Sequence, residues 1–227
     1  DGMNGVLADA RLICGNDLRL EWRGRVVLTQ VTPFVLATVT LFGFALDADS
    51  TTLRRTSTGL FWVVVVLSAV LVSQRGAAAE RNDGLGDALR LTGMSPAGMF
   101  LGRFLSLAAQ LVVVEIVAAL TMVVIFDLSP SGPLLSLTSM VLATMAIAAA
   151  CALYGPLVAG ISSRETVLPL LLVPALAPVL LAATRAMEVA QGRGVGDGWS
   201  WAGMLVIVAA VYVTLGMAMW GPLMEAT

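Results

Sequence analysis

The chain has 227 residues, of which 58% are hydrophobic and only 12% are charged. Soluble domains carry about 25% charged residues, so this composition excludes the ordinary water-soluble enzyme folds. The formal net charge of −2 indicates neither nucleic acid nor a polyanionic substrate as a partner. We therefore expect an integral membrane protein.

Long uncharged runs separate the bunched charged residues, and nearly every run supplies the roughly 20 apolar residues that a helix needs to cross a bilayer. A single carboxylate, Glu115, interrupts one of them. We predict an all-α integral membrane protein with six transmembrane helices. The transmembrane domain would cover residues 26–223, with spans at about 26–46, 56–74, 104–126, 134–154, 166–184 and 199–223.

Arginine supplies all 13 basic residues, and its distribution predicts the orientation. Loops rich in basic residues stay on the cytoplasmic side of a membrane. We therefore predict a multi-pass protein of the bacterial cytoplasmic (inner) membrane with both termini in the cytoplasm. The flanks on that side hold Arg11, Arg19, Arg23, Arg25, Arg75, Arg81, Arg90, Arg103 and Arg164, against Arg54, Arg55, Arg185 and Arg193 on the other.

Residues 1–25 precede the first span and show a helical stripe of apolar side chains. Arg11 and Glu21 fall in the same stripe. The pattern predicts an N-terminal helix that lies on the cytoplasmic interface, and an irregular soluble segment is the alternative. The apolar residues of the stripe are Leu7, Ala10, Cys14, Leu18 and Trp22.

Missing residue types exclude several kinds of chemistry. There is no histidine, so imidazole cannot ligate a metal or haem, and there is no lysine for a Schiff base or a Walker phosphate loop. Cys14 and Cys151 fall in different predicted elements, and we interpret them as isolated small apolar residues. We expect no catalytic residue, no metal site and no cofactor bound by this chain. If the protein does energy-dependent work, the energy must come from a partner or a gradient.

The cytoplasmic loop 75–98 carries more information than the helices. After a break at Asp83-Gly84, Leu85 and Leu89 lie on one face of a predicted short helix, beside Asp87 and Arg90. An amphipathic helix of this kind docks into a groove of a partner. A solvated connecting loop is the alternative, and periodicity alone does not separate the two.

Glu115 stands in the middle of the third span, where a carboxylate costs about 2.5–3.5 kcal/mol on insertion scales. We favour a hydrogen bond to Gln110 or to a Thr or Ser of a neighbouring helix. A subunit-interface role is the second interpretation. Proton coupling is the third, and the absence of other intramembrane carboxylates or histidines argues against it.

Pro169, Pro174 and Pro178 remove three backbone donors within ten residues of the fifth span. The helix must therefore bend or unwind locally. Three interpretations are open: a hinge, a packing surface for another membrane subunit, and a static kink.

Taken in order, these motifs resemble the heme exporter protein B family, the permease subunit of the cytochrome c maturation ABC transporter. That family carries an arginine eight residues before an Asp-Gly pair, then an acidic residue and a leucine. Arg75, Asp83, Gly84, Asp87 and Leu89 follow this pattern. The leucine- and proline-rich run that closes at Thr184 matches a second family feature, and the resemblance covers nearly the whole chain.

The resemblance implies a type-2-exporter-like ABC permease without catalytic residues, coupled to a separate cytoplasmic ATPase subunit that binds ATP and Mg. It also implies a haem-handling membrane subunit and a role in c-type cytochrome biogenesis, through haem export or release of a haem-loaded chaperone. A second copy of the chain is a further candidate partner. The coupling loop would use Arg75, Arg81, Asp83, Gly84, Leu85, Asp87, Leu89 and Arg90.

Two other classes of membrane protein are alternatives: an ABC-2-type permease for another substrate, and a gradient-driven carrier. Carriers commonly show internal repeats with interrupted helices in matching positions. The proline-rich fifth span has no counterpart among the first three spans, which favours the ATP-driven class.

Overall fold

The computed structural model describes residues 2–25, 27–46, 50–82, 94–126, 132–158 and 164–226. All regular structure in these ranges is helical. Six of the helical segments are long and apolar enough to cross a membrane, which confirms the predicted all-α membrane fold. They are Val27–Ala45, Thr52–Gln74, Pro96–Phe126, Pro133–Leu157, Thr166–Ala190 and Gly198–Pro222.

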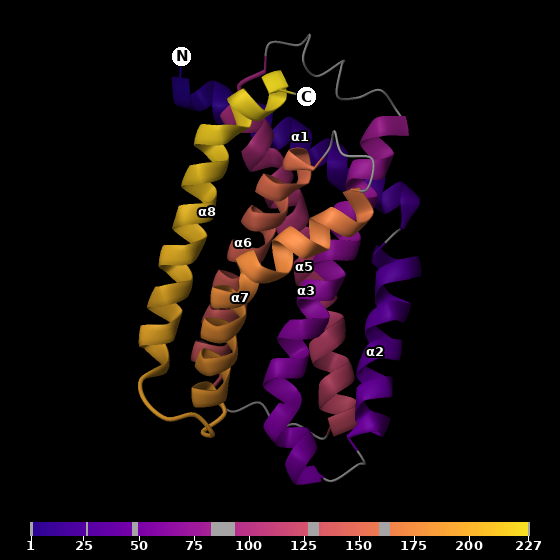
Figure 1. Ribbon diagram of the computed structural model, residues 1–227, viewed down its shortest axis with the longest axis vertical. Coiled ribbons are helices and arrows are strands. Elements are labelled where there is room, and N and C mark those ends of the chain that lie inside the picture. Colours follow the sequence, from indigo (N-terminus) through magenta and orange to yellow (C-terminus); the bar gives the residue numbers. More distant parts are fainter. Residues whose placement is uncertain are drawn as a thin grey trace.

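The long helices run up and down in sequence, so both chain ends lie at the same end of the bundle (Figure 1). We call it the terminal end and the other the opposite end. A first helix passes along the terminal end, and a short π-helix joins it to the bundle. In order the elements are α1 (Gly2–Gly24), η1 (Val27–Val31), α2 (Thr32–Ala45), α3 (Ser50–Asn82), α5 (Pro96–Phe126), α6 (Pro133–Leu157), α7 (Arg164–Ala190) and α8 (Gly198–Ala226).

Helix α5 begins eight residues earlier than the predicted span at 104–126. Its start is marked by Pro96, a residue suited to the first helical turn because its missing N–H needs no partner there. With 31 residues α5 is roughly 46 Å long, which exceeds a hydrocarbon core of about 30 Å. The predicted span stopped short of Arg103, but the helix includes this arginine, whose guanidinium pairs with a carboxylate of α1.

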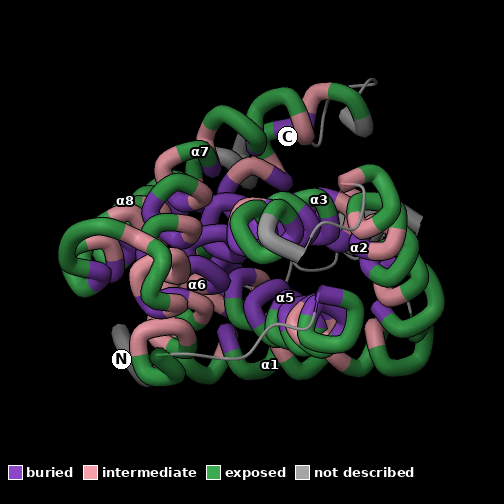
Figure 2. The backbone as a smooth tube through the Cα atoms, turned by 90° about the horizontal axis from the view of Figure 1, so that it is seen from below, coloured by how far each residue is buried: buried purple, intermediate pink, exposed green. Residues whose placement is uncertain are grey.

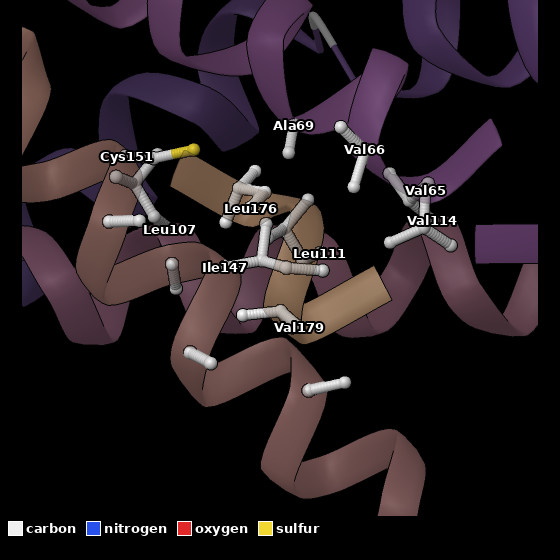
Figure 3. Packing of buried hydrophobic residues seen from close by; sticks show 14 of the residues in the cluster. Val65, Val66, Ala69, Leu107, Leu111, Val114, Ile147, Cys151, Leu176 and Val179 are labelled. Carbon is white, nitrogen blue, oxygen red and sulfur yellow. The ribbon is translucent and has the colours of Figure 1, made fainter. Parts of the chain in front are cut away.

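The apolar core lies between α3, α5, α6 and α7, and α3 has the largest buried share of the spans. Figure 2 shows the buried residues gathered inside the bundle, and Figure 3 shows side chains of the four helices meeting. In α6 a run of fully buried alanines lets neighbouring helices approach closely. Cys151 lies in this core as a buried free thiol.

Helix α7 continues through Pro169, Pro174 and Pro178, and Figure 1 shows it changing direction part-way along. The prolines therefore bend the helix but do not unwind it. The hydroxyl of Tyr212 on α8 donates a 2.6 Å hydrogen bond to the carbonyl of Ala175 within the bent stretch. The bond joins α8 to α7 one residue after Pro174, whose own carbonyl has no i+4 donor because Pro178 lacks an N–H.

Candidate functional site

Helix α1 separates its charges between two faces. Its three acidic residues are partly buried against the bundle, whereas its three arginines are exposed. This division leaves the carboxylates available to bond neighbouring helices. The acidic residues are Asp9, Asp17 and Glu21, and the exposed arginines are Arg11, Arg19 and Arg23.

Asp9 reaches the start of α5. Its Oδ2 accepts hydrogen bonds from both the backbone N–H and the hydroxyl of Ser95, each at 2.9 Å. The Ser95 Oγ in turn accepts from the N–H of Gly98 at 3.3 Å, as an N-cap residue does. The carboxylate also lies where the positive end of the helix dipole favours a negative charge. The start of α5 is therefore stabilised by a residue of another helix.

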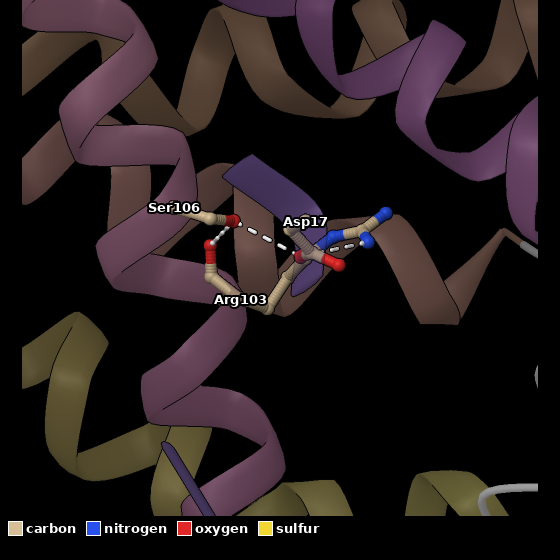
Figure 4. A network of polar contacts seen from close by, with 3 residues as sticks. All are labelled: Asp17, Arg103 and Ser106. Carbon is tan, nitrogen blue, oxygen red and sulfur yellow. Dashed lines mark hydrogen bonds and ion pairs between the residues drawn. The ribbon is translucent and has the colours of Figure 1, made fainter. Parts of the chain in front are cut away.

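Asp17 makes a second connection to α5, and Figure 4 shows its partners. Its Oδ2 accepts from Arg103 Nη1 at 3.3 Å and from the Ser106 hydroxyl at 3.0 Å. The ion pair is mostly withdrawn from water, with side-chain exposures of 17% for Arg103 and 14% for Asp17. Water and salt therefore weaken it less than they weaken a surface pair.

Two glycines let α1 approach α5 between these bonds. A Cβ on Gly102 would lie 2.7 Å from the Cβ of Ile13 and 2.8 Å from the carbonyl oxygen of Ala10. A Cβ on Gly98 would lie 2.9 Å from the carbonyl oxygen of Val6. No larger residue fits without displacing the α1 backbone. We call this set the α1–α5 clamp: Asp9, Asp17, Ser95, Gly98, Gly102, Arg103 and Ser106.

Our sequence analysis missed the clamp, although two signals for it were present. Gly98 and Gly102 have the G-x-x-x-G spacing that allows close helix packing. Asp9 and Asp17 lie eight residues apart, and Ser95 and Arg103 have the same spacing, so both bonded pairs are separated by 86 residues. That offset is visible only once the two helices are known to be neighbours.

The predicted apolar stripe of α1 is only partly directed at the bundle. Ala10 is buried and Cys14 is partly buried, but Leu7 and Trp22 are 59% and 81% exposed. The carboxylates share the inward face, which turns the apolar stripe toward its edge. Burial raises the pKa of the Cys14 thiol, and the nearby charge of Asp17 raises it further. A thiol that stays protonated is a weak nucleophile.

A third carboxylate of α1 connects it to the next element. Glu21 Oε1 accepts a 2.6 Å hydrogen bond from the backbone N–H of Val27, at the start of η1. Between them Arg25 adopts a left-handed backbone with a φ of 50°. The chain therefore changes direction within a few residues. Side chains of α1 bond both η1, which follows it, and α5.

Glu115 lies between α5 and α6 and is 3% exposed. The Thr144 hydroxyl on α6 lies 2.5 Å from Glu115 Oε1 and 2.8 Å from the Met140 carbonyl oxygen. Thr144 is thus the neighbouring-helix partner, and its single proton gives the pair two arrangements. The hydroxyl donates to an ionised Glu115, or it donates to Met140 and accepts from a protonated Glu115. The functional role of Glu115 stays a prediction.

At the opposite end the turn between α7 and α8 is built locally. The N–H of Gly192 bonds to Val189, and the N–H of Gly194 bonds to Glu188, at 2.9 Å each. These bonds close the turn through its own backbone. Asp197 then accepts from the N–H of Trp199 at 3.1 Å and from the hydroxyl of Ser200 at 3.0 Å. Its carboxylate caps α8.

The sequence of this helical bundle is similar to known proteins. A family model described as CcmB protein matches residues 9–221. The chain belongs to the CcmB protein family. The match begins at Asp9 and therefore includes both carboxylates of the clamp. Heme exporter protein B of Haemophilus influenzae is 27% identical over 205 residues, which cover 88% of this chain and 89% of that protein. The family predicted from the loop and the fifth span is confirmed.

Family membership and the apolar helices together identify the chain as a multi-pass membrane permease that belongs to a complex with other transporter subunits. Among the described residues no three histidine, cysteine or acidic side chains are grouped to hold a metal ion. The candidate functional features in the described residues are the contacts between helices: the α1–α5 clamp and the Glu115–Thr144 pair.

The segment 75–98, predicted as a loop, is helical at both ends, since α3 continues to Asn82 and α5 begins at Pro96. Arg75 and Arg81 therefore belong to α3, and their side chains lie outside the described part of the chain. Ser95 of the clamp lies near the other end of the same segment, directly before α5. The other predicted coupling residues lie outside the described residues: Asp83, Gly84, Leu85, Asp87, Leu89 and Arg90.

Proposed function

We propose that this chain is the permease subunit of an ABC transporter complex in c-type cytochrome biogenesis. It couples ATP hydrolysis by a partner subunit to haem export or to release of a haem-loaded chaperone. The family match over residues 9–221 carries the proposal, and the name of the Haemophilus relative supports haem as the cargo.

The ATPase is a separate cytoplasmic subunit in this proposal, and it binds ATP and Mg. The absence of lysine supports this division, because a Walker phosphate loop needs one. The arginine-rich flanks support a cytoplasmic position for the terminal end, in the bacterial inner membrane. The further partner is a haem-handling membrane subunit.

Loop 75–98 is the proposed contact with the ATPase. Asp83-Gly84 supplies a turn, Leu85 and Leu89 supply an apolar knob, and a polar rim surrounds them. An amphipathic helix docks through such a face because apolar anchors fill a groove while charged residues stay in water. The rim is formed by Arg81, Asp87 and Arg90.

The proposal is tested by purifying the tagged protein from native membranes in mild detergent and identifying bound proteins by mass spectrometry. We expect an ABC ATPase together with cytochrome c maturation subunits. An ATPase with unrelated partners would retain the permease assignment and remove haem as the cargo. Recovery of the chain alone, able to move a solute, would contradict the proposal and favour a gradient-driven carrier.

Loop variants test the coupling role itself. Leu89→Ala should abolish stimulation of the partner ATPase and block cytochrome c maturation, because the apolar anchor is lost. Val195→Ala is the matched control, since Val195 is 96% exposed in the turn at the opposite end. Normal ATPase stimulation and normal maturation with Leu89→Ala would show that the coupling assignment is wrong.

A further inference from the structure

The α1–α5 clamp holds the point at which the proposed coupling loop ends. Ser95 lies in the segment 75–98 that carries the proposed coupling residues and directly precedes α5, and two of its groups donate hydrogen bonds to Asp9. We propose that Asp9 and Asp17 are positioning residues that make α1 and the start of α5 a single unit, so that movement received by the loop reaches α5. This inference rests on the proposed function.

The first step is the bond at Ser95. A helix start normally frays, because its first N–H groups have no partner within the helix. Here Asp9 accepts from both donors of Ser95, while the Ser95 Oγ holds the N–H of Gly98. The first turn of α5 cannot move away from α1 without breaking these bonds. The loop therefore ends on a fixed point.

The second step is the spacing of the two connections. A single bond would leave α5 free to pivot on α1, but Asp17 bonds Arg103 and Ser106 about two turns further along. Gly98 and Gly102 lie between the connections and bring the backbones into contact. Two separated bonds with close packing between them prevent both rotation and sliding.

The third step is the continuity of α5. The helix contains no proline beyond Pro96 at its start. It runs past the clamp to Glu115, whose bond to Thr144 joins it to α6. Displacement of Ser95 therefore reaches the middle of the bundle through one uninterrupted helix. In α7 three prolines interrupt the backbone ladder, which makes α7 a poorer route for such a movement.

The experiment uses the complex of the chain with its ATPase, reconstituted in lipid vesicles, with ATP hydrolysis as the readout. Asp9→Ala should lower kcat at least fivefold, leaving the KM for ATP and the amount of bound ATPase within twofold of the wild type. Asp9→Asn keeps an oxygen acceptor and should retain at least half of the rate. Asp197→Ala is the matched control, because it removes the same kind of cap from α8 and should leave the rate unchanged.

Each outcome decides the inference. A wild-type rate from a folded Asp9→Ala complex would overturn it while leaving the proposed function intact. If Asp9→Ala does not assemble, Ser95→Ala decides, since it removes only the hydroxyl bonds: a two- to threefold loss of rate supports the inference and an unchanged rate overturns it. A wild-type chain that neither binds nor stimulates an ATPase removes the proposed function, and the inference with it.

Discussion

The starts of α5 and α8 show the same chemistry arranged in two ways. Each is held by an aspartate that accepts one backbone N–H and one hydroxyl. For α8 this is Asp197, next to the helix in sequence, whereas for α5 it is Asp9, 86 residues away. A local cap stabilises one helix. A distant cap also joins two helices, so its loss should be felt in both.

The surroundings of Asp197 and Asp9 also differ in how closely they involve other helices. Asp197 is exposed, and Arg193 of the same turn contacts the Ser57 hydroxyl of α3 at 3.4 Å. Asp9 is partly buried and has Asp17 and two glycines beside it. At the opposite end the start of α8 is therefore capped by its own turn, while at the terminal end the start of α5 is bonded to a helix far away in the sequence.

Filling the closest contact between α1 and α5 should have the largest effect on stability, and a matched change in α8 should have little. Gly102→Leu places a side chain where even a Cβ would lie 2.8 Å from the Ala10 carbonyl oxygen. We expect it to destabilise the protein by about 3 kcal/mol, at the upper end of overpacking effects. Gly203→Leu on α8 is the control, because a Cβ there meets nothing within 4 Å. Thermal unfolding in detergent measures both, and equal melting temperatures would contradict the clamp.

A substitution at Thr144, in the middle of the bundle, tests whether the two helix starts are independent of the core. Thr144→Val removes the hydroxyl that bonds Glu115, and an unsatisfied buried polar group costs about 1–3 kcal/mol. Thr144→Ser keeps the hydroxyl and should stay close to the wild type in unfolding experiments. Hydrogen exchange at the starts of α5 and α8 should not change. If either start loses protection, the two ends are not independent of the bundle centre.

Removing the two caps compares them directly. Asp9→Ala should cost about 1 kcal/mol, the net contribution of a typical hydrogen bond, because it releases the N-cap residue Ser95. Amide exchange should become faster both in α1 and in the first turn of α5. Asp197→Ala should have the smaller effect on stability, with faster exchange confined to the first turn of α8. Faster exchange limited to α5 in Asp9→Ala would show that the distant cap does not join the helices.

The smallest expected effect is a pH dependence at α8. The hydrogen bonds from the Trp199 N–H and the Ser200 hydroxyl lower the pKa of Asp197 below its ordinary value of 3.8. A carboxylate whose pKa is lowered by folding stabilises the fold above its unfolded pKa, and the effect disappears as the pH falls through the folded value. Trp199 fluorescence should therefore change below pH 3.8. Asp197→Asn should remove the change, and its persistence would assign it to another group.

The spans were predictable because the signal is local: a hydrocarbon core demands about 20 apolar residues in a row. The start of α5 was not predictable in this way. Arg103 ends an uncharged run, and nothing near it in sequence indicates Asp17 as its partner. The inward face of α1, which carries Asp9 and Asp17, was not predicted for the same reason. Contacts across 86 residues decide both features.

In the candidate site, too, local features were predictable and contacts between distant helices were not. A Thr or Ser partner for Glu115 followed from the cost of an unpaired carboxylate in a membrane, but Thr144 was identified only by the packing of α5 on α6. The coupling roles from Arg75 to Arg90 stay predictions, since the loop positions after Asn82 lie outside the described residues. The clamp was missed because its signals, two carboxylates and two glycines, are each common alone.

The bond from Tyr212 to Ala175 has a consequence for how the chain enters the membrane. Each proline of α7 removes a backbone donor, so α7 enters the hydrocarbon with carbonyl groups that its own backbone does not bond. Tyr212 belongs to the helix that is synthesised next, after a short ordered turn. The Tyr212 bond lies beside the freed Pro174 carbonyl, at Ala175, and fastens the bent part of α7 to α8. We therefore expect the two helices to leave the translocon together as a helical hairpin.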